Sequence, residues 1–176
     1  LFLCNPHNPV GRVWTKAELT QLGAICRQNG VVVVSDEIHA DITFQNFPYT
    51  PFASISDADA QNSITCLSPA KSFNIAACCG AFTVVFDENR RNALKAENSR
   101  LTVNKNNAFA SVAMEAAYKD GGPWLDSAIT YIEGNLSLVR ACLSDIPEVS
   151  LIEPEGTFLL WLDFRNLGLQ PDELTQ

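Results

Sequence analysis

The sequence is poor in positive charge, and this shortage bears on its partners. Its 176 residues include 12 lysines and arginines against 20 aspartates and glutamates, which gives a formal net charge of −8 at pH 7. A protein surface that binds nucleic acid usually carries a basic patch or stripe. Such a surface is not expected here, so we predict no nucleic-acid partner.

The sequence also lacks a long apolar run and a paired-cysteine motif. No apolar run approaches the roughly 20 residues that a membrane-spanning helix needs, so we expect no membrane span. The opening LFLCNPH carries no basic leader of the kind that begins a signal peptide. The six cysteines include no C-x-x-C pair, and only two histidines are present. We therefore expect reduced thiols, a cytoplasmic location and no metal site.

What is present is a globular composition arranged as alternating strands and helices. Hydrophobic residues make up 47% of the chain and charged residues 18%, which is typical of a folded domain. Residues 1–4 form a short apolar run. Thr15 and Glu18 then have the spacing of a capping box, at the start of a helix that we expect to end at Asn29-Gly30. The apolar run 31–36 is typical of a buried strand, so the three elements predict a βαβ unit with parallel strands.

Further strands and helices are expected in the rest of the chain. We expect two further strands at 63–68 and 80–86, three helices at 87–101, 110–120 and 125–145, and two short strands within 149–164. The chain starts on Leu1, without an initiator methionine, and its closing PDELTQ is typical of the first turn of a helix. We therefore expect a fragment of a longer protein.

Polar residues follow the first three predicted strands at the point where each strand ends. In open parallel α/β sheets, ligands bind outside the carboxyl ends of the strands. Asn8 follows the first strand, Asp36 and His39 follow the second, and Ser68 and Lys71 follow the third. One lysine and one carboxylate on a common rim suit pyridoxal phosphate, whose aldehyde takes a lysine and whose ring nitrogen takes an acidic partner.

Three segments in this order, NPHNPVG, SDEIHADI and SPAKSFNIA, resemble the fold-type I pyridoxal-phosphate enzymes of the class I/II aminotransferase superfamily. The pieces SDEIH, KSFNIA and LLWLDF resemble its MalY/PatB group of cystathionine β-lyases. The resemblance implies an α/β fold: a three-layer α/β/α large domain with a mostly parallel sheet, followed by the start of a small α+β domain. We place the large domain at 1–135 and the small one at 136–176. It also implies a homodimer with a small amino-acid substrate.

The resemblance assigns a role to each of the five rim residues. Lys71 would form the Schiff base with pyridoxal phosphate and, once released by substrate, would move the α-proton. Asp36 would pair with the pyridine nitrogen, and Asn8 would hydrogen-bond the phenolate oxygen. His39, which stands three residues after Asp36 where aminotransferases commonly place a tyrosine, would also contact the cofactor, and Ser68 would hold the phosphate. The alternatives are an ordinary exposed lysine at Lys71 and a turn-capping hydroxyl at Ser68. We expect the neighbouring Glu37 to be a loop acid without a catalytic role.

Two departures from the family pattern bear on the reaction. Cys79 stands eight residues after Lys71, where many aminotransferases carry a phosphate-gripping arginine that the lyase group tends to lack, and Ala77 replaces a usual glycine. The resemblance thus implies a carbon–sulfur β-lyase that acts on cystathionine or another cysteine S-conjugate and yields a thiol, pyruvate and ammonia. The alternatives are an aminotransferase of the same fold and an inert or regulatory cofactor-binding fragment. The family takes its ring-stacking aromatic, phosphate-binding turn and carboxylate-binding arginine from regions outside this sequence, so we expect the chain alone to be inactive.

Overall fold

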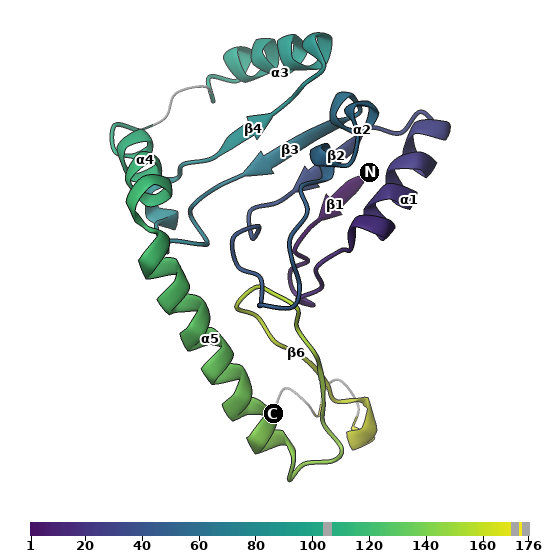
Figure 1. Ribbon diagram of the computed structural model, residues 1–176, viewed down its shortest axis with the longest axis vertical. Coiled ribbons are helices and arrows are strands. Elements are labelled where there is room, and N and C mark those ends of the chain that lie inside the picture. The colour runs from purple at the N-terminus through teal and green to yellow at the C-terminus, as the bar shows by residue number, and fades with distance from the viewer. Residues whose placement is uncertain (104–106, 170–172, 174–176) are drawn as a thin grey trace.

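The computed structural model describes residues 1–103, 107–169 and 173. Within them, a four-stranded sheet forms the centre of the first part of the chain (Figure 1). Its strands are β1 (Phe2–Cys4), β2 (Val33–Asp36), β3 (Ser63–Leu67) and β4 (Phe82–Val84), in that spatial order. The first three strands run parallel and β4 runs antiparallel to β3. The expected α/β class with a mostly parallel sheet is confirmed.

Helix α1 (Lys16–Gln28) links β1 to β2 and completes the predicted βαβ unit. The capping box is present, because the Thr15 hydroxyl accepts from the backbone N–H of Glu18 while the Glu18 carboxylate accepts from that of Thr15. Asn29 is the C-cap, and Gly30 follows with a φ of +65°, a conformation that glycine adopts without steric cost. The helix therefore begins and ends where local sequence signals place it.

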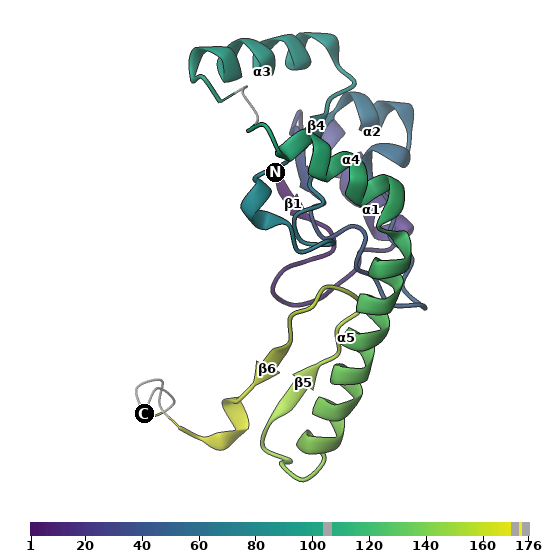
Figure 2. The ribbon, with the colours of Figure 1, turned by 90° about the vertical axis from the view of Figure 1, so that its left-hand side faces the viewer.

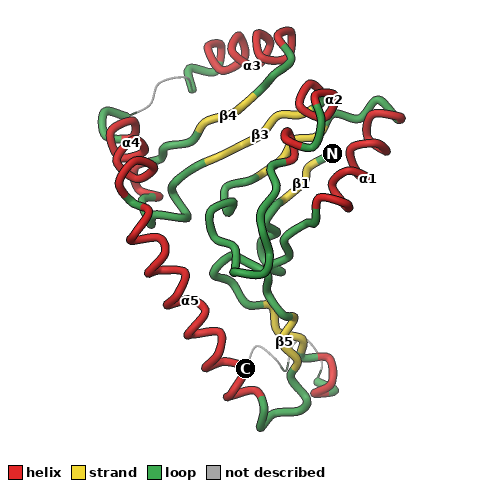
Figure 3. Tube along the Cα trace, viewed as in Figure 1, coloured by secondary structure: helices red, strands yellow, loops and turns green. Residues whose placement is uncertain are grey.

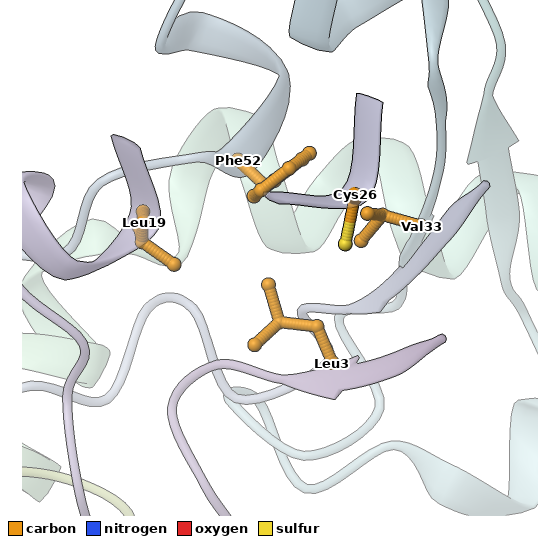
Figure 4. Packing of buried hydrophobic residues seen from close by; sticks show 5 residues of the cluster. All are labelled: Leu3, Leu19, Cys26, Val33 and Phe52. Atoms are coloured by element: carbon orange, nitrogen blue, oxygen red, sulfur yellow. The ribbon is translucent and has the colours of Figure 1, made fainter. Parts of the chain in front are cut away.

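The hydrophobic core lies between α1 and one face of the sheet (Figure 4). Leu19 and Cys26 of α1 pack with Leu3 of β1, Val33 of β2 and Phe52 from the short 3-10 helix Phe52–Ser54. Burial of a side chain of this size stabilises the fold by roughly 1.5–3 kcal/mol. Residues of the opposite face alternate with these along each strand.

The remaining helices are α2 (Asp57–Gln61), α3 (Glu88–Arg100), α4 (Ala110–Asp120) and α5 (Gly122–Leu143), and Figure 3 shows how they are distributed along the chain. Short 3-10 turns also occur at Ala76–Cys78 and Arg165–Leu167. Three of these helices were predicted. The five-residue α2, capped by the Ser56 hydroxyl, was not, because so short a helix leaves no apolar period in the sequence. None of the helices that the structure describes is both long and apolar enough to cross a membrane.

Strands β5 (Ser150–Ile152) and β6 (Trp161–Asp163) form a separate antiparallel hairpin, as expected. Figure 2 shows this hairpin beside α5, with the loop between its strands reaching back toward the sheet. Helix α5 runs through the predicted domain boundary at residue 135, which stays a prediction. The helical turn expected of PDELTQ falls outside the described residues, Glu173 excepted.

Candidate active site

The structure brings the loops that carry Asn8, Asp36 and Lys71 to one edge of the sheet. Asp36 is the last residue of β2 and lies opposite Cys4 of β1 and Cys66 of β3 in the parallel ladders. Asn8 follows β1 and Lys71 follows β3, so all three residues stand at or beyond carboxyl ends of parallel strands. This is the edge at which ligands bind in sheets of this kind.

In the loop after β1, two asparagines have different surroundings. Asn5 is buried, where its side chain donates to Thr50 O at 3.2 Å and accepts from Trp14 N at 3.1 Å. Asn8 is exposed, and its backbone N–H donates to Cys4 Sγ at 3.4 Å. The Asn8 amide group makes no hydrogen bond to the residues that the structure describes. Asn5 therefore holds the loop, while the Asn8 side chain is available to a ligand.

The Asp36 carboxylate is half-buried and only partly used by the protein. Its Oδ1 accepts from the backbone N–H of Ile38 at 3.3 Å. Its Oδ2 has no hydrogen-bond partner in the part of the chain that the structure describes. One carboxylate oxygen can therefore accept a proton or a hydrogen bond from a ligand at this edge.

Glu37 is buried at the centre of a hydrogen-bond network. Its carboxylate accepts from Ser35 Oγ at 2.7 Å, from Phe52 N at 3.0 Å, and from the hydroxyl of Tyr49. Burial, and next the charge of Glu37, raise the pKa of Tyr49 well above its usual value. Glu37 is thus an acid that joins the end of β2 to the loop 49–52. Its sequence position predicted a loop acid, but no local signal identified Tyr49 and Phe52 as donors to its carboxylate.

His39 is 1% exposed, and neither of its ring nitrogens has a hydrogen-bond partner among the described residues. Burial lowers its pKa, and the positive charge of Lys71 lowers it further, while the negative charge of Asp36 acts in the opposite direction. The imidazole is therefore neutral at pH 7. Buried polar atoms without partners are rare in folded proteins. The two ring nitrogens of His39 are therefore suited to hydrogen bonds with a polar group of a bound ligand.

The segment after β3 places Lys71 and Ser68 in contrasting environments. The Lys71 side chain is exposed, and its amine forms neither a hydrogen bond nor an ion pair with the residues described. Ser68 is buried, donates its hydroxyl proton to Gly80 O at 2.6 Å, and accepts from Ala70 N at 3.1 Å. A phosphate contact would require the bond to Gly80 to break. The turn-capping alternative describes the Ser68 hydroxyl in this structure, and its phosphate role stays a prediction.

A pocket of about 320 Å³ lies beside the Lys71 segment. Apolar side chains of α5 form one wall, and Ile42 and Phe158 contribute to the rest. No group of three or more potential metal ligands occurs in the described part of the chain. The edge therefore offers an amine, a half-free carboxylate, an amide and a neutral imidazole, which are groups for an organic ligand.

The loop between β5 and β6 also reaches this edge, which sequence reasoning did not foresee. The backbone N–H groups of Glu155 and Gly156 both donate to Gly11 O, at 2.8 and 3.1 Å. Thr157 N donates to Ile42 O at 2.8 Å. This loop is thereby joined to the loop that carries Asn8 and to the loop after β2 that carries His39. Contacts between segments so distant in sequence leave no pattern in either segment.

Comparison with known proteins gives a family for the whole chain. Residues 1–176 match the family model described as aminotransferase class I and II. The chain is 47% identical over 175 residues to cystathionine beta-lyase PatB of Bacillus subtilis, covering 99% of this chain and 45% of that protein. It is 35% identical over 176 residues to protein MalY of Escherichia coli, covering 99% and 44%.

A solved structure agrees with these relatives. The chain superposes on cystalysin from Treponema denticola, a structure that contains pyridoxal 5'-phosphate, with a TM-score of 0.93 and 33% identity. That match covers 99% of this chain and 44% of the other. The chain thus spans about half the length of the relatives that it matches.

Proposed function

The chain belongs to the class I and II aminotransferase family, and we propose on that basis that it is part of a pyridoxal-phosphate-dependent carbon–sulfur β-lyase. The substrate would be cystathionine or another cysteine S-conjugate. The observation that carries the proposal is the convergence of Asn8, Asp36 and Lys71 at the carboxyl edge of the parallel sheet, in a chain 47% identical to a cystathionine β-lyase.

The residues present fit pyridoxal phosphate by their chemistry. The cofactor needs an amine for its aldehyde and an acidic partner for its ring nitrogen. Lys71 has an unengaged amine, and Asp36 has one carboxylate oxygen without a partner in the described structure. The two buried nitrogens of His39, which also lack partners there, fit a polar ligand at this edge. Ser68 fits less well, because its hydroxyl proton is bound to Gly80 O.

Each of these groups has a definite task in the proposed reaction. Pyridoxal phosphate, when bound, supplies an electron-withdrawing ring that stabilises negative charge at the substrate α-carbon. Lys71 Nζ would hold the cofactor aldehyde and, when free of it, would accept the substrate α-proton. Asp36 would hold a proton on the ring nitrogen, and the Asn8 amide would orient the ring by donating to its phenolate oxygen. The neutral imidazole of His39 offers one donor and one acceptor nitrogen.

The overall reaction balances without any oxidant or second substrate other than water. The α-proton passes to Lys71 Nζ, the electron pair of the C–H bond forms a Cα–Cβ double bond, and the electron pair of the C–S bond leaves with sulfur, which then takes up the proton from Lys71. Water then releases pyruvate and ammonia from the remaining three-carbon unit. From cystathionine, the thiol released would be homocysteine.

An aminotransferase of the same fold would use the same residues, so support for a lyase must come from elsewhere. PatB bears the name of a cystathionine β-lyase. Cys79 occupies the position at which many aminotransferases carry an arginine. Both observations favour elimination over amino transfer.

The proposed enzyme also has an expected oligomeric state, cellular location and domain division. We infer a homodimer in the cytoplasm, with residues 1–135 in the cofactor-binding domain and 136–176 in a smaller C-terminal domain. The separate β5–β6 hairpin supports such a division. The small-molecule substrate would be an amino acid.

The deciding experiment uses the complete reading frame that contains this chain. The purified protein is incubated with cystathionine and no keto acid, and thiol and pyruvate are measured. We expect both products, and we expect Lys71→Ala to abolish them together with the visible absorbance of bound cofactor. Lys119→Ala, which removes an exposed lysine of α4, is the matched control and should remain active. Product formation that strictly requires a keto-acid acceptor would instead identify an aminotransferase.

A further inference from the structure

The relative position of Asp36 and Lys71 is determined by two loops that leave the sheet from the same place. Asp36 of β2 lies opposite Cys66 of β3, and the next residue, Glu37, donates its backbone N–H to Cys66 O at 2.9 Å. Beyond this point the two strands part. One loop carries His39 and Asp41, and the other carries Lys71 and Ser72.

The loop after β2 is held firmly to the body of the protein. Ala40 N donates to Glu37 O at 2.9 Å, and Ile42 N donates to His39 O at 3.0 Å, so the backbone forms two consecutive turns. The buried Glu37 carboxylate anchors the start of the loop through its three donors. The position of Asp41 therefore follows from that of Asp36.

The segment after β3 has hydrogen bonds within itself but few to its surroundings. Phe73 N donates to Pro69 O at 2.9 Å, and Ile75 N donates to Ala70 O at 3.1 Å. These bonds shape the segment, and Phe73 also packs against Tyr118 of α4 and Trp124 of α5, with 5.9 and 6.3 Å between ring centroids. Ser68 ties the beginning of the segment to Gly80.

One side-chain contact joins the two loops at their far ends. The Ser72 hydroxyl donates to Asp41 Oδ2 at 2.7 Å, and Ser72 is only 2% exposed. Among the described residues, no other hydrogen bond joins 37–44 to 69–76. The contact closes a ring that begins at the Asp36–Cys66 pair, passes along both loops and returns through the side chains.

We propose that Ser72 and Asp41 are a positioning pair that holds the backbone of Lys71 at a set location relative to Asp36. The inference rests on the proposed function, because it concerns how the amine reaches the cofactor aldehyde. Lys71 has a long, exposed side chain and directly precedes Ser72. The Ser72–Asp41 bond therefore limits how far the Lys71 backbone can move. Catalytic groups that are held in place react faster than groups that must be ordered at each encounter.

The strength of the Ser72–Asp41 hydrogen bond sets the expected change in the rate of cofactor capture. A partly buried hydrogen bond from a hydroxyl to a carboxylate is worth enough to change an equilibrium by about tenfold. We therefore expect Ser72→Ala and Asp41→Ala each to slow the capture of pyridoxal phosphate by Lys71 by about tenfold. Because both substitutions remove the same bond, the double variant should be no slower than either single variant.

The test follows the visible absorbance that appears when the cofactor-free, complete protein is mixed with pyridoxal phosphate. The variants are Ser72→Ala, Asp41→Ala, their combination and Ser72→Thr, which keeps the hydroxyl and should recover most of the rate. Ser137→Ala on the exposed face of α5 removes a hydroxyl that donates to Glu133 O of the same helix, and this variant should capture the cofactor at the unchanged rate. A wild-type rate in Ser72→Ala would overturn the proposal, as would single effects that simply add in the double variant.

A second measurement separates this proposal from the proposed function. Amide hydrogen exchange in the complete protein, without cofactor, should speed up at residues 70–74 in Ser72→Ala and stay unchanged in α1. If the complete protein never captures pyridoxal phosphate, the proposed function fails, and the exchange result alone decides whether Ser72 and Asp41 hold the segment. Unchanged exchange at residues 70–74 would contradict the pair in either case.

Discussion

The ring of Phe158 lies against the ring of His39, with 5.4 Å between the ring centroids and 59° between the ring planes. Phe158 belongs to the loop between β5 and β6, whereas His39 belongs to the loop after β2. The contact therefore joins the C-terminal hairpin to the candidate site. It also helps to bury the imidazole, which is the main reason that the pKa of His39 is lowered.

The lowered pKa of His39 predicts a loss of stability in mild acid. Between its folded pKa and the unfolded value of about 6.5, the unfolded chain binds more protons than the folded one. The contribution of this group to stability is thus complete above pH 6.5 and falls as the pH drops below it. We expect His39→Gln to reduce the difference in unfolding free energy between pH 7.5 and pH 5.5. The measurement is urea unfolding of both proteins at the two pH values, and parallel losses would contradict the prediction.

The carboxylate of Glu155 attaches the β5–β6 loop to the segment that precedes α1, so its removal should destabilise the fold. It accepts from Val13 N at 2.7 Å and forms an ion pair with Arg12. Glu155→Ala leaves these two donors without their partner and should destabilise the fold by about 1.5–3 kcal/mol. Glu153→Ala in the same loop is the control, because its pair with Arg140 is exposed and should contribute less than about 1 kcal/mol. Urea unfolding followed by circular dichroism compares them, and equal losses would refute the assignment.

The contact between Gly11 and Pro154 predicts a penalty for any side chain at Gly11. The residue has a φ of +81°, and an added Cβ would lie 2.7 Å from Pro154 Cβ. Gly11→Ala therefore combines backbone strain of about 1–2 kcal/mol with a clash of about 1–3 kcal/mol. Gly30→Ala isolates the strain, since Gly30 has a φ of +65° and, its chain neighbours aside, no described residue places a heavy atom within 4 Å of an added Cβ. Thermal unfolding should rank Gly11→Ala clearly below Gly30→Ala, and equal midpoints would argue against the clash.

The burial of Phe52 predicts a large cost for truncation. Phe52 is fully buried in the core beneath α1, and its backbone N–H binds the Glu37 carboxylate. We expect Phe52→Ala to lower the free energy of unfolding by about 3–5 kcal/mol. Phe47→Ala, in the same connection but at a partly exposed ring, should cost less than about 1 kcal/mol. Denaturant unfolding of the two variants gives the comparison, and similar losses would show that Phe52 is not a core residue.

The elements that could be predicted from the sequence are those set by local signals. Thr15 and Glu18 lie three residues apart and cap the same helix, so their interaction depends only on short-range geometry. The apolar run 31–36 predicts a buried strand, and β2 forms within it. Placing Asn8, Asp36 and Lys71 at one edge required one further rule, that successive parallel strands end on the same side of a sheet.

The state of each side chain at that edge could not be predicted in this way. Nothing near Ser68 in the sequence shows that its hydroxyl proton is bound to Gly80, and nothing near Glu37 shows its bond to Tyr49. Such bonds depend on where two separate segments of the chain lie in the folded protein, which neither segment specifies by itself.

The sequence alone therefore determined the order of strands and helices and the residue types that end each strand, because apolar period and capping act within a few residues. The tertiary structure decided which of these residues are free to act. It buried His39 without a hydrogen-bond partner among the described residues, bonded Ser72 to Asp41 and brought the β5–β6 loop against both site loops. These outcomes arise because close packing joins groups that are far apart in sequence, and only the folded chain holds them within hydrogen-bonding distance.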